Sequence, residues 1–318
     1  MPGSSGRHSR VPVDARVAIY LFVRYAVVLA ACALLVKYLF LDTVAVTTDQ
    51  MSPTLVDGDR VALLRTPFIR PFNRMFLPAR GAPVVVRHPL FLKKYACLRV
   101  AGLPGDTIAV GKGRCMVNNR PSARFGAPMA TEEALPPAFS PRDSMPSVRL
   151  PRRGDVIDLD SLSLWDFFFY VAIIKQDDPG GRYRVRTQLS IDGKPAEGFV
   201  IADFSLYKGT LDTVPERFEY DWFFWDRLRE YCSHVLAGKD FSLKFDFFTG
   251  AEKVTHYRVK KSFIFLLADD WRKGFDSRYF GPVPVSSIKG RPVCVLWSWA
   301  HGEGGGFLRV SRTMKIVK

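Results

Sequence analysis

Hydrophobic positions near the start of the chain form one long segment, and after it they occur only in short runs. Residues 17–41 are mostly apolar, and their charge-free part extends from Tyr25 to Val36. A helix that crosses a bilayer needs about 20 such residues. Arg24 and Lys37 flank the charge-free part, and their long side chains can reach toward polar headgroups. We therefore predict one membrane-spanning helix over residues 17–41.

The charges around this segment predict its orientation. Positive residues next to a membrane helix stay on the cytoplasmic side. Those that precede the apolar centre are Arg7, Arg10, Arg16 and Arg24. Residues 1–16 are therefore expected in the cytoplasm and residues 42–318 outside it, with a single pass through the membrane.

The same segment has two other interpretations. A cleaved secretory signal is disfavoured because Arg24 interrupts the apolar run and no clean cleavage site follows it. Leu29-Ala30-Ala31-Cys32 also matches a lipoprotein-type site, although alanine-rich runs produce such a string by chance. An uncleaved anchor is favoured over both.

The chain after residue 41 contains many short strand-like runs. Each is bounded by Gly, Pro or Asp, which is typical of strands in an antiparallel β domain. In the first part of the chain these runs are 44–46, 60–64, 83–86 and 98–101, and similar runs return over 262–298.

The middle of the chain follows a different pattern. Residues 121–150 are rich in Pro, Ser and Ala and predict a loop or insert. Residues 164–174 predict a buried element, and residues 214–236 have apolar side chains at helical spacing. Alternation over 241–247 predicts a strand, which Thr249-Gly250 turns back toward 256–259 as a hairpin.

Composition narrows the classes of partner. The chain has 318 residues, of which 47% are apolar and 24% charged, so a packed core is expected. The net charge of +15 is spread along the whole chain rather than concentrated in one helix or tail. This pattern favours attraction to anionic membrane lipid over nucleic-acid binding. The five cysteines form no CxxC pair, so neither a zinc site nor a disulfide framework is expected, and no metal or cofactor is predicted.

Three separated stretches carry a sequence motif. MSPTL at 51–55 is followed by Gly58-Asp59, and RVAGLPGD occupies 99–106. DSRYFGPVP occupies 276–284 and precedes GRPV at 290–293. In this order, and after a membrane segment, the three stretches together resemble the type I signal peptidase family (S26), the membrane-anchored Ser/Lys peptidases.

The resemblance covers residues 17–120 and 255–300, whereas residues 121–254 match only loosely. It implies a mainly β fold, in which residues 42–120 and 255–318 form a signal-peptidase-like antiparallel β domain. Residues 121–254 would be an enlarged α+β cap insertion. The resemblance also implies the bacterial plasma membrane as the location, and protein secretion or signal peptide processing as the setting.

The residues that carry the chemistry of the family are replaced in this chain. In the family a serine hydroxyl attacks the peptide bond, and a lysine that burial keeps neutral accepts its proton. The resemblance places Gln50 at the nucleophile position and Leu98 at the base position. Gly274 stands where a serine orients the lysine. Thr48 falls at the side-chain donor of the oxyanion hole and keeps a hydroxyl.

The motif residues around these positions are largely retained, although Ala268-Asp269-Asp270-Trp271 stands where the family has Gly-Asp-Asn-Arg. In the family the retained charged residues support the architecture of the site. The groove and motif residues that the resemblance assigns are Met51, Pro53, Thr54, Leu55, Arg99, Gly102, Pro104, Gly105, Asp106, Asp269, Asp276, Ser277 and Arg278.

These replacements predict a pseudoenzyme. Because nucleophile, base and orienting group act as a unit, losing all three leaves a fold with its groove but without its chemistry. We expect a non-catalytic homologue that binds signal-peptide-like segments beside a strand edge, or that partners an active signal peptidase or the secretion machinery. A structural membrane protein without peptide affinity is a third interpretation.

The alternative is an active signal peptidase I, a serine endopeptidase that removes signal peptides from exported preproteins, with unorthodox residues. Ser52 is the fallback nucleophile, but on a strand it would lie ~7 Å from position 50, and Lys94 would lie ~13 Å from position 98. Catalysis tolerates far smaller displacements. Lysines that the fold brings in from elsewhere, such as Lys260, Lys261 and Lys273, leave this alternative open.

Three other reactive side chains have plainer interpretations. His88, before Pro89, is expected in a surface loop, and His256 is expected to be structural. Cys97 should point to the opposite face of its strand from Leu98, as a small buried side chain.

Overall fold

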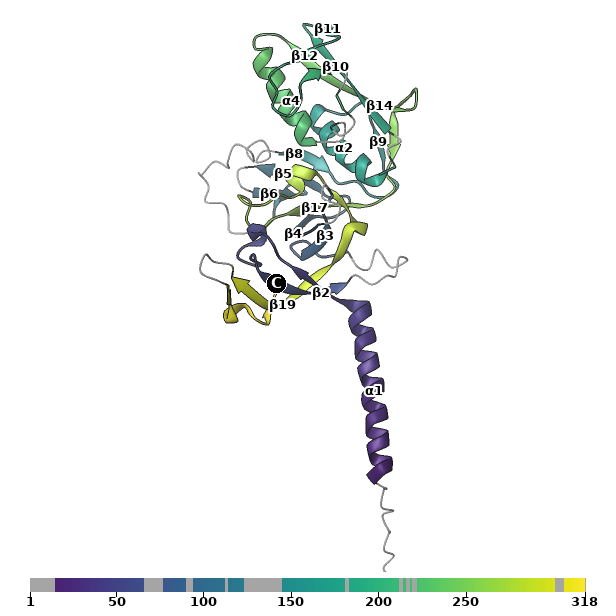
Figure 1. Ribbon diagram of the computed structural model, residues 1–318. Coiled ribbons are helices and arrows are strands. Elements are labelled where there is room, and N and C mark those ends of the chain that lie inside the picture. Colours follow the sequence, from purple (N-terminus) through teal and green to yellow (C-terminus); the bar gives the residue numbers. More distant parts are fainter. Residues whose placement is uncertain are drawn as a thin grey trace, which may run out of the picture.

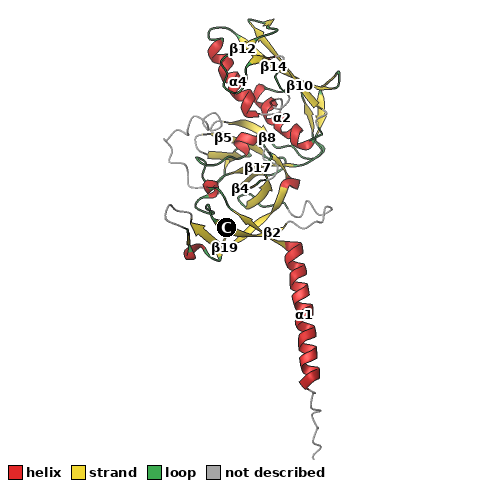
Figure 2. Ribbon diagram, viewed as in Figure 1, coloured by secondary structure: helices red, strands yellow, loops and turns green. Residues whose placement is uncertain are grey.

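The computed structural model describes residues 15–65, 77–89, 94–111, 114–122, 145–180, 183–211, 214–215, 218, 222–300 and 306–317. A long helix, α1 (Ala15–Phe40), stands apart from a β-rich body, and a smaller region of helices and strands lies at the opposite end of that body (Figure 1). Strands make up most of the body (Figure 2), so the protein is mainly β, as the sequence predicts.

Helix α1 has the length and composition of a membrane span. Its segment Val17–Leu35 has a mean hydropathy of 2.2 and is 0% buried within the structure. Such a row of exposed apolar side chains is unusual on a soluble surface. The predicted range of 17–41 agrees with the helix to within about two residues, the usual uncertainty of a helix end.

One curved antiparallel sheet forms the body and carries the strand that follows α1. Its order is β1-β2-β19-β3-β4-β17-β18, with β20 and β21 added on β19. The long strand β19 pairs first with β3 and then with β2, and register shifts at Pro292 and Val295 let it bend between them. The strands are β1 (Leu41–Ala45), β2 (Asp59–Arg65), β3 (Pro83–Arg87), β4 (Tyr95–Gly102), β17 (Phe263–Leu267), β18 (Val283–Pro284), β19 (Ile288–Ala300), β20 (Phe307–Leu308) and β21 (Lys315–Ile316).

Two four-stranded sheets and two strand pairs complete the described β structure. The first sheet has the order β7-β6-β5-β8 and the second has the order β11-β10-β14-β15. The pairs are β12-β13 and β16-β9. These strands are β5 (Thr107–Gly111), β6 (Arg114–Val117), β7 (Arg120–Pro121), β8 (Met145–Arg149), β9 (Val156–Asp158), β10 (Tyr183–Ile191), β11 (Lys194–Pro195), β12 (Val200–Ile201), β13 (Gly209–Thr210), β14 (Phe241–Thr249), β15 (Glu252–Val254) and β16 (His256–Arg258).

Aromatic side chains fill the core of the far region, where helices α2 (Leu164–Asp177) and α4 (Trp222–Val235) pack near β14. Phe167 of α2 stacks on Phe245 of β14 with ring centroids 4.0 Å apart, and Trp225 of α4 meets Phe245 edge-on. The body has two smaller apolar clusters. One contains Leu98, Val100 and Leu266, and the other contains Met51, Leu55 and Val61.

Two local predictions differ from the structure. The hairpin partner of β14 is β15 rather than residues 256–259, because Gly250, at φ 62°, turns the chain back immediately. Residues 256–258 instead form β16 and pair with β9. Part of the predicted loop is β8, which pairs with β5, while residues 123–144 lie outside the described part of the chain. Of the predicted helix over 214–236, α4 covers Trp222–Val235, whereas residues 216–217 and 219–221 lie outside the described part of the chain.

A buried ion pair holds the turn before the short helix α5 (Ser277–Phe280). Arg278 is fully buried, and its Nε donates to Asp276 Oδ1 at 2.9 Å. We expect Asp276→Ala to lower the free energy of unfolding by about 3–5 kcal/mol, because it leaves a buried guanidinium without its counter-charge. The matched control is Glu230→Ala, which breaks the exposed Arg227–Glu230 pair and should cost less than about 1 kcal/mol. Denaturant titrations of the two variants in detergent measure these free energies of unfolding. Equal decreases in the two variants would contradict the prediction.

Candidate functional site

The guanidinium of Arg99, in the second motif stretch on β4, connects Thr54 of the first stretch to Asp269, which follows β17. It donates from Nε and Nη2 to the two carboxylate oxygens of Asp269, both at 2.7 Å, and from Nη1 to the carbonyl of Gly81 at 2.7 Å. The hydroxyl of Thr54 donates to Asp269 at 2.6 Å and accepts from Arg99 at 3.1 Å. Arg99 and Asp269 are buried, and a two-pronged pair of this kind fixes both position and orientation.

The other predicted motif residues lie in two further structural networks. Asp276 accepts from the backbone N–H groups of Ala268 and Arg278, and the Ser277 hydroxyl accepts from Leu266 N–H. These bonds tie the third motif stretch to β17.

The glycines and Asp106 of the second motif stretch form the junction between the body and the adjoining small sheet. A Cβ on Gly102 would lie 2.5 Å from Ile108, and one on Gly105 would collide with the guanidinium of Arg152. Pro104 accepts from Arg152 through its carbonyl, and Asp106 receives two hydrogen bonds from Arg80. These residues shape the scaffold and do not line the cavity described next.

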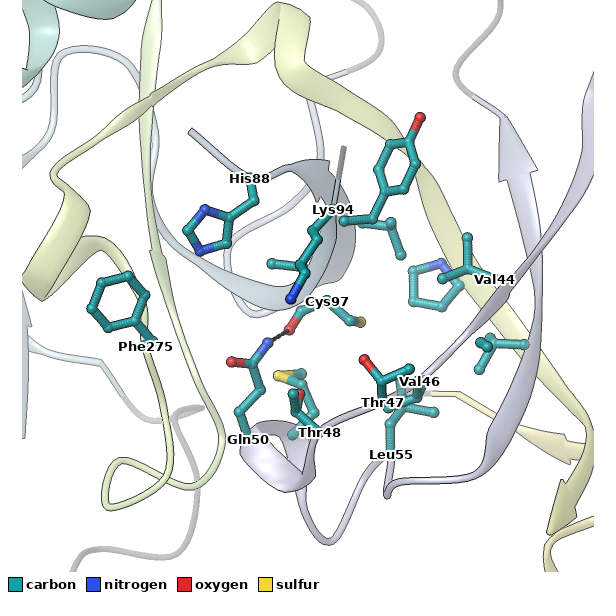
Figure 3. A pocket seen from close by; sticks show the side chains of 17 residues that line it. Val44, Val46, Thr47, Thr48, Gln50, Leu55, His88, Lys94, Cys97 and Phe275 are labelled. Carbon is teal, nitrogen blue, oxygen red and sulfur yellow. Dashed lines mark hydrogen bonds between the residues drawn. The ribbon is translucent and has the colours of Figure 1, made fainter. Parts of the chain in front are cut away.

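A cavity of about 470 Å³ opens between two strand edges of the body. One wall comes from β1, the residues after it and the short turn η1 (Asp49–Met51), and the other comes from the start of β4 (Figure 3). Of the predicted site residues, Thr48, Gln50, Met51 and Leu55 line it. The full lining is Val44, Ala45, Val46, Thr47, Thr48, Gln50, Met51, Leu55, Val61, Val85, His88, Lys94, Tyr95, Ala96, Cys97, Phe275 and Pro292.

Both walls are edges that can accept another strand. β1 stands at the end of its sheet and pairs with β2 on one side. The first residues of β4 pair with β3, and the partner on the other side, β17, begins its pairing only at Arg99. Among the described strands, none covers the second edge of residues 95–98. An extended peptide could therefore add its backbone hydrogen bonds here.

Gln50, which the resemblance places at the nucleophile position, reaches across this cavity. Its Nε2 donates to the backbone carbonyl of Cys97 at 3.2 Å (Figure 3). Its backbone carbonyl accepts from Asp270 N–H at 3.0 Å. The backbone of Gln50 is thus held by the segment after β17 and its side chain by β4. A carboxamide has no hydroxyl or thiol to attack a peptide bond.

Leu98, which the resemblance places at the base position, is 0% exposed and packs with Val84, Val100 and Ala268 in an apolar cluster. It is not among the described residues that line the cavity, whereas its neighbour Cys97 is. Successive side chains on a strand point to opposite faces, as the sequence predicts for this pair. Burial, and then the charge of Asp269, raise the pKa of Cys97 to about 12, so the thiol stays protonated.

Thr48 and Ser52, the two hydroxyls near Gln50, occupy different places. Thr48 is exposed and lines the cavity. Ser52 ends η1, is half-buried and is not among the described residues that line the cavity. The bond between Ser52 and Pro53 is cis.

His88 differs from its sequence-based interpretation. It is buried rather than exposed in a loop, because its ring stacks on Phe275 at 5.8 Å and meets Phe280 edge-on at 5.2 Å. Burial, and then the nearby positive charge of Lys94, lower its pKa to about 4. The imidazole is therefore neutral at physiological pH. Its apolar ring partners lie almost two hundred residues away in the sequence, so no local pattern could reveal them.

Lys94 brings a positive charge to the cavity. It lies just before β4, is exposed, and points toward the bond between Gln50 and Cys97 (Figure 3). The sequence-based distance of ~13 Å between Lys94 and position 98 assumes a regular strand. Lys94 comes just before β4, which begins at Tyr95. The lysines considered as alternatives, Lys260, Lys261 and Lys273, are not among the described residues that line the cavity.

Two of the replaced positions are physically coupled. Gly274 lies against Ala268, and a Cβ added at 274 would collide with the Cβ of Ala268 and lie 2.9 Å from the carbonyl oxygen of Asp270. The resemblance places serine at 274 and glycine at 268. The methyl group of Ala268 therefore excludes the orienting serine, and the two changes keep the local volume nearly constant.

This coupling predicts a non-additive mutational result. We expect Gly274→Ser to destabilise the protein by about 1–3 kcal/mol through overpacking, and Ala268→Gly in the same chain to recover most of that loss. Gly111→Ser is the control, because a Cβ at Gly111 meets no atom within 4 Å. Denaturant titrations of the two single variants and the double variant measure the interaction energy. If the changes in unfolding free energy of the two single variants simply add in the double variant, the predicted contact between positions 268 and 274 would be wrong.

The burial of neutral His88 predicts a pH dependence of stability. Its folded pKa of about 4 lies below the ordinary value of 6.5, so the folded state prefers the neutral ring. The contribution of His88 to the free energy of unfolding is complete above pH 6.5. It falls by about 3 kcal/mol as the pH is lowered to 4, because the unfolded chain then binds a proton that the folded ring resists. His88→Phe, which keeps a ring against Phe275, should remove this part of the acid sensitivity. The free energy of unfolding measured from pH 7 to pH 4 tests this, and parallel curves for the two proteins would contradict it.

Comparisons with known proteins agree with the motif stretches. The sequence pattern of one family, signal peptidase or peptidase S26, matches residues 19–158 and 179–297. A crystal structure of a signal peptidase I from Enterococcus faecalis is similar to this chain, at 13% identity and a TM-score of 0.24, over 68% of this chain and 96% of that one. No curated protein matches the chain. Because the family pattern extends over well over half of its residues, the chain belongs to the signal peptidase family, peptidase S26.

Proposed function

We propose that this member of the signal peptidase family is catalytically inactive and binds signal-peptide-like segments in extended form. The observation that carries the proposal is Gln50, whose amide is held against the Cys97 carbonyl at the position where the family has its serine. The base position supports it, because Leu98 sits in an apolar cluster and cannot accept a proton.

The cavity itself supports the binding part of the proposal. It lies between two strand edges, which favours an extended peptide held by backbone hydrogen bonds. Its volume falls within the usual range of ligand pockets, roughly 300–1,000 Å³. Apolar side chains such as Val46, Met51 and Leu55 line it, and they suit the apolar residues of a signal-peptide-like segment.

The second candidate is an active signal peptidase I with a different set of residues. It would need a hydroxyl and a neutral amine in contact. Ser52 does not line the cavity among the described residues, and Lys94, which does line it, is exposed and therefore not desolvated. These placements favour the inactive form.

We place the protein at a membrane, with the N-terminus in the cytoplasm and the body outside the bacterial plasma membrane. The exposed apolar helix α1 and the family are compatible with such an anchor. A second apolar surface on β19 to β21 lies toward the end of the body from which α1 leaves, and we expect it to contact lipid (Figure 1). Its members are Trp297, Trp299, Phe307, Leu308, Val310, Met314 and Ile316.

Photo-crosslinking combined with a cleavage assay tests the proposal. We expect full-length protein in detergent micelles to leave a preprotein uncut. A photoreactive residue at Thr47, which lines the cavity, should crosslink to the signal peptide of the preprotein, because the peptide lies along that edge. The same residue at Glu197, exposed in the far region, is the control and should not crosslink.

Two outcomes would contradict this function. A missing crosslink at Thr47 would remove the evidence for peptide binding and favour a purely structural role. Cleavage of the preprotein that Ser52→Ala abolishes would show an active peptidase instead.

A further inference from the structure

The bond between Gln50 and Cys97 bridges the two walls of the cavity. Gln50 comes from η1 on one wall, and Cys97 belongs to β4 on the other, so the carboxamide spans the two strand edges. A peptide added along β4 uses successive carbonyls of that edge as acceptors. The carbonyl of Cys97 is already engaged. An extended chain that enters from the side of Lys94 therefore meets the Gln50 side chain as a barrier.

The charge of the cavity complements a chain end. Lys94 is the charged side chain among the described residues that line it, and none of those residues is Asp or Glu. His88 is neutral at physiological pH and adds no charge. Thr48 offers an exposed hydroxyl, and Nε2 of Gln50 carries a second N–H besides the one it donates to Cys97. Such donors around a cation suit a carboxylate better than a neutral peptide bond.

We propose that the cavity binds the free C-terminal carboxylate of an apolar peptide, that is, the end of a signal peptide after cleavage rather than an uncut preprotein. The ammonium of Lys94 supplies the charge, and Thr48 and Gln50 supply hydrogen bonds to the carboxylate oxygens. This inference rests on the proposed peptide-binding function and specifies its ligand. It gives Gln50 a binding role, since its amide both stops the chain and donates to the chain end.

The apolar lining fits the residues before that carboxylate. Side chains of the last residues of the peptide would point alternately toward the floor of the cavity and away from it, because strand side chains alternate. The floor is formed by a buried apolar cluster that includes Met51, Leu55 and Val61. Apolar residues at the end of the peptide would therefore be favoured, and charged ones would be disfavoured by desolvation.

Fluorescence anisotropy with three peptides tests the proposal on the full-length protein in micelles. The peptides share one signal-peptide-like sequence and a label at the N-terminus. One ends in a free carboxylate, one in a carboxamide, and one continues for several residues past that point. We expect the carboxylate form to bind about ten-fold more tightly than the other two, about 1.4 kcal/mol, as is usual for hydrogen bonds to a charged group.

Two matched variants assign the preference to Lys94. Lys94→Met should reduce the preference to less than about three-fold without weakening the carboxamide peptide, because the side chain is exposed and its loss disturbs no core. Lys273→Met, which removes an exposed cation that does not line the cavity, should leave the preference unchanged.

The outcomes separate this inference from the function on which it rests. Equal affinities for the three peptides would overturn the carboxylate proposal and leave peptide binding intact. A preference that survives in Lys94→Met would also overturn it, because the charge would then act from elsewhere. Failure of all three peptides to bind would overturn both.

Discussion

The ion pair between Arg99 and Asp269 is the constraint on which the rest of the site depends. It fastens β4 to the end of β17, and the Thr54 hydroxyl adds the loop after η1 to the same pair. Both charged groups are buried, so either one alone would leave an uncompensated charge. This structural demand applies even if the nucleophile and base positions hold Gln50 and Leu98, as the resemblance implies. The scaffold requires them whether or not a peptide bond is cut.

The replaced positions are adapted to one another and to their surroundings. Leu98 joins an apolar cluster in which a charged lysine would be strongly disfavoured. Ala268 occupies the space that a side chain at Gly274 would need. Gln50 makes a hydrogen bond across the cavity that a serine hydroxyl is too short to make. Each of these three residues thus packs or hydrogen-bonds well in its surroundings, as a stable fold requires.

The electrostatics of the cavity bear on the proposed loss of catalysis. A Ser/Lys peptidase needs a desolvated, neutral amine beside its nucleophile. Here the amine of Lys94, which lines the cavity, is exposed. The buried imidazole of His88 stays neutral. The groove thus combines apolar walls, two strand edges and one positive charge. These properties are consistent with the proposed binding of a peptide without cleavage.

The sequence by itself determined the apolar helix, most strands of the body and the three motif stretches, because these depend on local periodicity, turn residues and short-range spacing. It also predicted that Cys97 and Leu98 face opposite ways. The tertiary structure decided which of those faces lines the cavity, that β14 pairs back onto β15, and that His88 is buried. It also showed that Ala268 leaves no room for a side chain at position 274, and that Gln50 hydrogen-bonds to Cys97. Such contacts join segments far apart in the chain, and their geometry is set by strand register, bulges and packing that no local pattern encodes.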